Sequence, residues 1–224
     1  RDETPAQAGA AHYLEHLLFK GTPRRSALDI SASIDGVGGE MNAFTSKEYT
    51  CFYARVLDQD LPLAVDVISD IVTSALLRAH DVDSERDVIL EEIAMYKDNP
   101  FWVLYEAAVE KNFGSHPLAH RVLGTSESIT ALERDRMQEY FDARYSADNT
   151  VVALAGRMDF ARVCDQIEGL CGAWARTAPR RDNAKPPIQG GRFDIRDAKV
   201  TRAYWLGMCE APAVADDRRY AAAM

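Results

Sequence analysis

Long apolar runs are missing from this sequence of 224 residues. No stretch approaches the roughly 20 apolar residues that a helix needs to cross a bilayer, and no signal peptide is visible. We therefore expect a protein without a membrane partner.

Basic clusters are also scarce. The sequence has 26 Lys and Arg residues against 35 Asp and Glu residues, a net charge of -9, and its Lys/Arg runs never exceed two residues. Binding to a phosphate backbone needs a basic face, so this composition argues against a nucleic-acid partner.

Cysteine is rare too. The four cysteines show neither a CxxC pair nor the spacing of a disulfide framework: Cys51, Cys164, Cys171 and Cys209. In a chain of this length they indicate reduced thiols, most of them in the core, and a cytoplasmic location.

What is present is enough apolar sequence, 47% of residues, to bury a core, in a length that suggests one domain and part of another. Residues 175–191 are rich in Pro, Gly and charge, which is typical of a linker. We assign a domain to residues 1–178, a linker to 179–191 and the start of a second, truncated domain to 192–224. Both ends look cut, and we expect a fragment.

Apolar spacing predicts the secondary structure. The expected helices cover residues 9–20, 26–35, 61–75, 84–99, 101–112, 130–144 and 159–174, with one more starting near 216. The expected strands cover residues 40–45, 48–57, 150–155, 192–197 and 200–209, and the strand at 150–155 should be buried.

Helix 9–20 carries the first candidate site. At about 100° per residue, His12, Glu15 and His16 project into one arc of roughly 100°. The rest of the helix is apolar almost all round, so it should be buried, where charge is costly unless it is paired or bound to metal. A cation would satisfy all three side chains. The alternative is that two histidines happen to face a polar cleft.

A catalytic zinc ion needs three protein ligands and one open position, so a third ligand must come from elsewhere. Helix 84–99 offers one. Glu92 falls in the middle of the helix's apolar arc, Glu91 falls outside it, and Glu85 lies two turns before Glu92 on the same face. That arc is formed by Val88, Ile89, Ile93, Met95 and Tyr96, whereas Leu90 does not fit. The alternative is that both Glu91 and Glu92 are surface charges.

The order His-x-x-Glu-His is the inverzincin signature. Here it stands in GAAHYLEHLLFKGT, with GGEMNAFTSKEYTCFYARVL at residues 38–57 and ERDVILEEIAMYKDNP at 85–100. Together with HPLAHRVLGT at 116–125 and ALAG at 153–156, these motifs resemble those of the M16 peptidases, the family of pitrilysin and the mitochondrial processing peptidase, and most of all its smaller bacterial members.

The resemblance implies an α+β fold, in which helices pack on a mixed, largely antiparallel sheet, followed by the beginning of a second similar unit. It implies a zinc-dependent endopeptidase that hydrolyses extended oligopeptides. His12, His16 and Glu92 would be the zinc ligands, with Glu15 as the base that activates water at the zinc. Glu85 would support the site from behind.

The resemblance also places the substrate. Asn42 matches a family residue near the metal, and Ala43 and Phe44 lie on the strand whose edge pairs with an extended peptide. The family's first strand has no counterpart before Arg1, and the Arg and Tyr that its later half contributes are absent too. We therefore expect zinc binding but weak or no cleavage by this chain alone, with a homodimer partner or a second half-subunit completing the enzyme.

Two other functions stay open. The family includes partner subunits that keep the fold and have lost the site, so the chain could be a non-catalytic scaffold. It could also be a regulatory zinc module, which would share the ligands and would not require Glu15.

Overall fold

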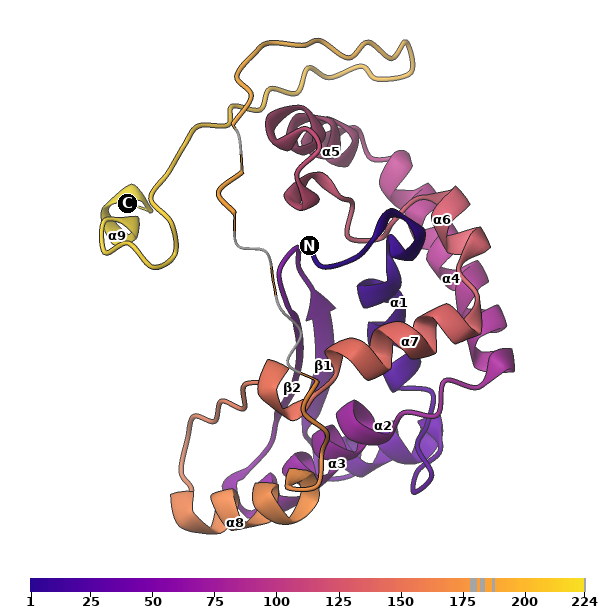
Figure 1. Cartoon of the computed structure of the whole chain (residues 1–224), viewed down its shortest axis with the longest axis vertical. Coiled ribbons are helices and arrows are strands. Elements are labelled where there is room, and N and C mark those ends of the chain that lie inside the picture. Colours follow the sequence, from indigo (N-terminus) through magenta and orange to yellow (C-terminus); the bar gives the residue numbers. More distant parts are fainter. Residues whose placement is uncertain (178–180, 182–183, 187, 224) are drawn as a thin grey trace. The chain divides into compact units, whose positions relative to one another are not determined.

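The structure is a computed structural model that describes residues 1–177, 181, 184–186 and 188–223 (Figure 1). Its helices are α1 (Ala10–Leu18), α2 (Ala27–Asp35), α3 (Leu61–Ser74), α4 (Ala79–Lys97), α5 (Pro100–Phe113), α6 (Ser126–Ala131), α7 (Arg134–Arg144), α8 (Phe160–Cys171) and α9 (Arg219–Ala222). Its strands are β1 (Glu40–Thr45) and β2 (Thr50–Arg55). Helices packed with an antiparallel pair of strands confirm the α+β class.

Contacts divide the chain into two compact units. Unit 1 comprises residues 1–93 and 121–183, and unit 2 comprises residues 94–120 and 184–224. Helix α4 therefore contributes to both. The domain boundaries expected at residues 178 and 191 stay a prediction.

Strands β1 and β2 form an antiparallel hairpin in unit 1, with a register that runs from Glu40 opposite Arg55 to Thr45 opposite Thr50. Side chains alternate along β1, so that Phe44 is exposed while Thr45 is half-buried. The turn is closed by Ser46, whose N–H donates to the carbonyl of Tyr49 over 2.8 Å. The first predicted strand is thus correct, and the second is shorter at each end than expected.

Helix α1 lies in the core of unit 1 and contacts β1, β2 and α7. Tyr13, Leu14, Leu17 and Leu18 are all buried, as the apolar surround of this helix predicts. The N-cap residue of the helix is Gly9, which has a left-handed φ of 92°. A Cβ atom there would lie 2.7 Å from the Ile129 side chain.

The first turn of α1 is held by a half-buried carboxylate. Glu3 accepts hydrogen bonds from the N–H groups of Gly9, over 2.9 Å, and Ala11, over 2.7 Å. These are donors that the helix itself leaves unpaired. Burial raises the pKa of Glu3.

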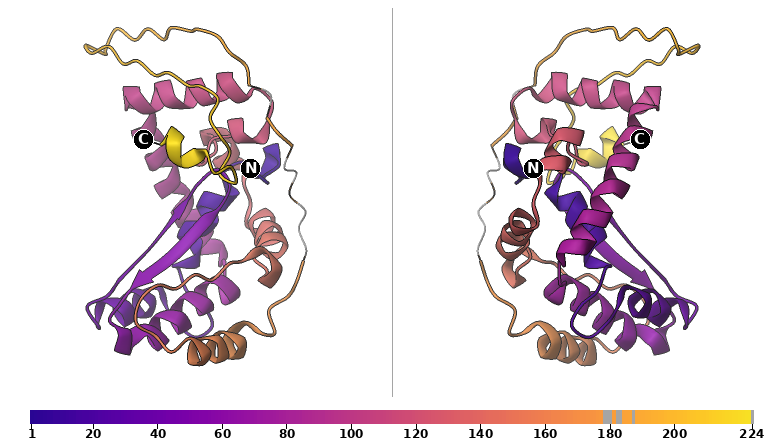
Figure 2. Two further views of the ribbon diagram at one scale, coloured as in Figure 1. Left: turned by 90° about the vertical axis from the view of Figure 1, so that its left-hand side faces the viewer. Right: turned by 90° about the vertical axis from the view of Figure 1, so that its right-hand side faces the viewer.

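Helix α3 packs against α2, β2 and α8, which Figure 2 shows from two sides. Its carboxylates Asp66 and Asp70 pair with Arg24 and Arg25 in the segment that precedes α2. Buried or half-buried carboxylates need such partners, so this network fixes the path of the chain after α1.

Three predicted strands are wrong. Residues 150–155, 192–197 and 200–209 form no strand among the described residues. Val151 is 91% exposed and Trp205 is 89% exposed, so their apolar side chains are not buried either. A strand needs a neighbour to take its backbone hydrogen bonds, and the two described strands, β1 and β2, pair only with each other.

Two helix predictions also need correction. The helix expected to start near residue 84 begins at Ala79, because Val82 in its charged first turns is fully buried and extends the packed face. The helix expected at 130–144 is two helices, α6 and α7, separated at Leu132 and Glu133.

The cysteines are free thiols, as expected. Cys164 and Cys209 are exposed, however, so the prediction that most cysteines lie in the core is wrong. Within the described part of the chain, every helix is too short or too polar to span a bilayer.

Candidate metal centre

Helices α1 and α4 bring three possible metal ligands together in unit 1. His12, His16 and Glu92 each offer one ligand atom, and these atoms all lie within 4.8 Å of one another. Oε2 of Glu92 is 3.5 Å from Nε2 of His12 and 3.8 Å from Nε2 of His16. The two imidazole rings meet edge to face, with centroids 4.7 Å apart. The arc on α1 and the carboxylate on α4 therefore converge.

The orientation of α4 separates the two candidate glutamates. Glu91 is exposed, whereas the Glu92 side chain is only 24% exposed and faces the histidines. Ile89 and Ile93 are buried as the arc predicts. The predicted apolar arc is wrong at its edges, because Val88 and Met95 are exposed, whereas Leu90 packs against the core.

The pKa values of the three groups shift in different directions. Burial, together with the charge of His16, lowers the pKa of His12 to about 4, so His12 is neutral near pH 7. The hydrogen bond between His16 and Glu85 raises the pKa of His16, and burial raises the pKa of Glu92. Glu15 acts on both His16 and Glu92 through its charge, which places it beside the cluster.

Glu85 orients one of the two imidazoles. Glu85 is buried, and its Oε1 lies 2.8 Å from Nδ1 of His16. Because a carboxylate only accepts, Nδ1 carries the proton and Nε2 is left free toward Glu92. Burial works against ionisation of Glu85, but hydrogen bonds from His16 and Lys20 hold its pKa below the usual value. His12 has no such partner at Nδ1 among the described residues, so packing orients that ring.

Glu15 is held from the strand side. The hydroxyl of Thr45, on β1, donates a hydrogen bond to Oε2 of Glu15. Thr45 also lies 3.1 Å from the hydroxyl of Thr50, its partner across the hairpin. The candidate base is thus fixed to the same strand that carries the expected substrate-binding residues.

The expected substrate-binding residues lie on β1. Phe44 is exposed and contacts the rings of Tyr49 and Tyr53. Oδ1 of Asn42 accepts a hydrogen bond of 2.8 Å from the N–H of Ala43. Within the described strands β1 pairs only with β2, so its other edge is not paired (Figure 1).

The donor set fits zinc. Ligands of a tetrahedral zinc ion at ~2.0–2.2 Å lie roughly 3.3–3.6 Å from one another. The separations from Glu92 to the two histidines, 3.5 and 3.8 Å, are close to that value. A neutral His12 and a His16 oriented through Nδ1 are the states that a metal requires of imidazole. His12, His16 and Glu92 could therefore hold the ion.

Two contacts were not foreseen from the sequence: Lys20 on Glu85 and Thr45 on Glu15. Signals for both existed. Lys20 comes four residues after His16, and alternation along residues 40–45 places Thr45 on the face opposite Phe44. Neither pattern predicts which residue Lys20 or Thr45 contacts, because the contacts depend on how α4 and β1 pack against α1.

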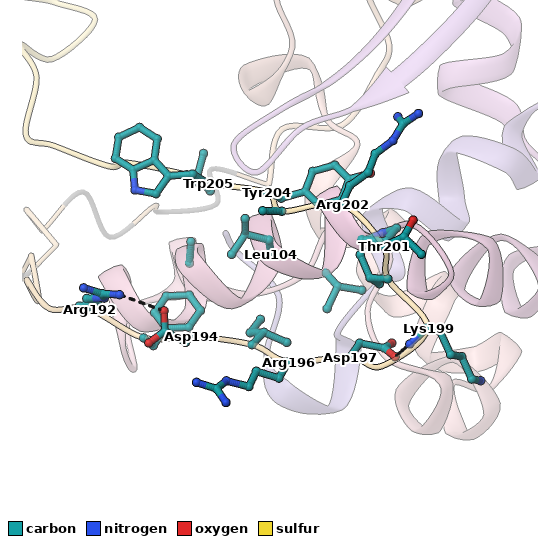
Figure 3. Close-up of a pocket in the computed structure, with 18 of the residues that line it drawn as sticks. Leu104, Arg192, Asp194, Arg196, Asp197, Lys199, Thr201, Arg202, Tyr204 and Trp205 are labelled. Carbon is teal, nitrogen blue, oxygen red and sulfur yellow. Dashed lines mark hydrogen bonds and ion pairs between the residues drawn. The ribbon is translucent and has the colours of Figure 1, made fainter.

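Unit 2 contains a hollow of about 1340 Å³ (Figure 3). It is lined by α5 residues such as Leu104 and by the chain from Gly191 to Met208. Among its charged side chains, Arg192 pairs with Asp194 over 3.5 Å. It contains none of the residues predicted for the site.

A ligand set of two imidazoles and a carboxylate, backed by a second carboxylate, defines a candidate divalent-metal centre in an α+β unit. Comparison with known proteins identifies the family. Residues 1–126 match the family model "Insulinase (Peptidase family M16)", and residues 131–224 match "Peptidase M16 inactive domain". The chain belongs to the M16 peptidase family.

Its relatives carry names of the same kind. An uncharacterized zinc protease of Streptomyces coelicolor is 46% identical over 99% of this chain and 50% of its own length. An uncharacterized zinc protease of Mycobacterium tuberculosis is 51% identical over 71% of this chain and 36% of its own length. The chain thus spans about half the length, or less, of these curated relatives. Their names support a peptidase-like function that depends on zinc.

Solved structures agree on the fold. A protease from Helicobacter pylori aligns with a TM-score of 0.75 and 21% identity, over 84% of this chain and 45% of its own. Pitrilysin aligns with a TM-score of 0.70 and 21% identity, over 84% of this chain and 21% of its own. At this identity the likeness concerns the fold alone.

Proposed function

We propose that this chain is the zinc-binding part of an endopeptidase that hydrolyses extended oligopeptides. One observation carries the proposal: His12, His16 and Glu92 converge, and Glu15 lies beside them on the helix of the two histidines. A scaffold or partner subunit has no use for four buried or half-buried polar groups in this arrangement.

Zinc, when bound, supplies a Lewis acid that acidifies water and polarises the peptide carbonyl. The chain's own residues do the rest. Glu15 takes a proton from the attacking water and later returns it to the leaving nitrogen, which needs a carboxylate free to alternate between the two. The Thr45 hydroxyl holds one oxygen of Glu15, Oε2, and leaves Oε1 for the proton.

Strand β1 would hold the substrate. A peptide added to the edge of β1 that pairs with no described strand would be bound by main-chain hydrogen bonds, which suits extended substrates and tolerates varied side chains. Phe44 would contact substrate side chains through its exposed ring. The N–H of Ala43 already has an acceptor in Asn42, so a peptide carbonyl reaching this donor would displace that amide oxygen.

The decisive experiment is Glu15→Gln in the full-length protein, measured for zinc content and for cleavage of a quenched extended peptide. Glutamine keeps the shape of the side chain and cannot act as a base. We expect about one zinc per chain, as in the wild type, and a rate lower by about 10²–10⁴-fold.

Glu91→Gln is the matched control, since it makes the same change on the exposed face of α4 and should keep both zinc and activity. Cleavage retained by Glu15→Gln would refute the assignment of the base. A wild-type protein that takes up no zinc would favour the scaffold instead.

The relatives are about twice as long as this chain, and we propose that the remaining part, or a second copy, completes the active enzyme. The 224 residues alone should bind zinc and cleave slowly or not at all. Comparing their zinc content and rate with those of the full-length protein tests this, and light scattering of the full-length protein tests for a dimer.

A further inference from the structure

We propose that Lys20 is a positioning residue for the metal centre, acting on His16 through Glu85. The inference rests on the proposed zinc site and adds a residue to which no role has been assigned. Lys20 follows the end of α1, four residues after His16, and would not touch metal or substrate itself.

The geometry is a chain of three side chains. Nδ1 of His16 lies 2.8 Å from Oε1 of Glu85, while the ammonium of Lys20 bonds Oε2 of the same carboxylate. The two oxygens are therefore both occupied, one by the candidate ligand and one by the lysine. A carboxylate held at both oxygens cannot rotate about its terminal bond without breaking one contact.

Burial makes the second contact matter. The Glu85 side chain is 7% exposed, and that of Lys20 is 35% exposed. Water has little access to Glu85, so an oxygen that lost Lys20 would gain little solvation in place of that bond. Glu85 would then turn to find another donor, and His16 would lose the fixed direction of its Nε2.

The direction of the change in zinc affinity on removal of Lys20 distinguishes a positioning role from a purely electrostatic one. Removing a positive charge near a cation site should tighten binding of the cation by Coulomb attraction alone. If Lys20 acts by fixing Glu85, its removal should weaken binding instead. The two explanations predict opposite changes in zinc affinity.

The test is a zinc titration of the full-length protein against a competing chelator, with Lys20→Met. We expect an affinity about tenfold lower, the lower end of the range for residues that orient a metal ligand. Lys20→Arg should restore most of it, because a guanidinium can still hold the carboxylate. Lys199→Met is the control, since it removes an exposed lysine in unit 2 and should change nothing.

A double-mutant cycle tests whether Lys20 acts on His16 through Glu85. In a Glu85→Gln background, Lys20→Met should change the affinity by less than about twofold, because its only path to His16 is gone. Thermal unfolding of each variant shows whether it is folded; if Lys20→Met is not, Lys20→Gln is measured in its place with the same expectation.

Unchanged or tighter zinc binding by Lys20→Met, or an equal loss in both backgrounds, would overturn the inference. A wild-type protein that binds no zinc would instead overturn the proposed function, so the two failures are distinguishable.

Discussion

Helix α1 and residues 150–155 are two apolar segments of unit 1 with opposite fates. In α1, Leu14 and Leu18 are fully buried. In residues 150–155, of sequence TVVALA, Val151 is 91% exposed. Composition does not separate them. The difference is that β1, β2 and α7 contact α1, while none of the described strands pairs with the other segment.

The comparison shows that an apolar pattern predicts only that a segment is suited to burial. Whether the segment is buried depends on which other helices and strands pack against it. The same holds in unit 2, where residues 192–197 and 200–209 alternate like strands and remain without a ladder. It also explains why polar groups on α1 can be used for chemistry: a buried helix holds its charged side chains in fixed places.

The largest effect should come from Glu92, where α4 meets α1. Glu92→Ala removes a carboxylate that faces both histidines, so the full-length protein should lose stoichiometric zinc binding and cleavage. Metal analysis after dialysis measures this. Glu91→Ala is the control, because Glu91 is exposed and should not matter. Equal losses in both variants would mean that α4 does not select one face for the metal.

A core substitution in α1 should follow. Leu14→Ala leaves a cavity among packed neighbours, and we expect a loss of about 2–5 kcal/mol in the free energy of unfolding. Denaturant unfolding monitored by circular dichroism measures it. A loss below about 1 kcal/mol would show that α1 is less tightly packed than the structure indicates.

Thr45→Val tests a smaller effect on the hairpin. Removing the hydroxyl frees Oε2 of Glu15, and we expect kcat about tenfold lower, because hydrogen bonds to charged groups contribute about 1.5–3 kcal/mol. KM and zinc content should hardly change. Thr45→Ser keeps the hydroxyl and should recover the rate; failure of this rescue would mean that the methyl group, and hence packing, matters.

The smallest effect should come from Val151→Ala in the exposed segment. With its side chain already in water, the free energy of unfolding should change by less than about 0.5 kcal/mol, measured beside Leu14→Ala. A loss comparable to that of Leu14→Ala would remove the contrast between the two segments.

The sequence alone predicted much of the candidate site, because helical periodicity is a local property. His12, Glu15 and His16 share an arc wherever α1 is placed, and Glu92 follows from the apolar face of its own helix together with the family resemblance. Lys20 and Thr45 could not be assigned partners, since their contacts depend on tertiary approach. The three wrong strands failed for the same reason: a strand-like sequence pattern is local, whereas a ladder requires a second strand.

The hairpin register has a consequence for the evolution of this site. Phe44 and Thr45 are adjacent on β1 and face opposite sides, so a one-residue slip would exchange them. The ring would then press against Glu15, and the hydroxyl would point to solvent. Insertions or deletions between residues 46 and 49 should therefore be rare among active homologues, since one lost residue there would misalign substrate and base together.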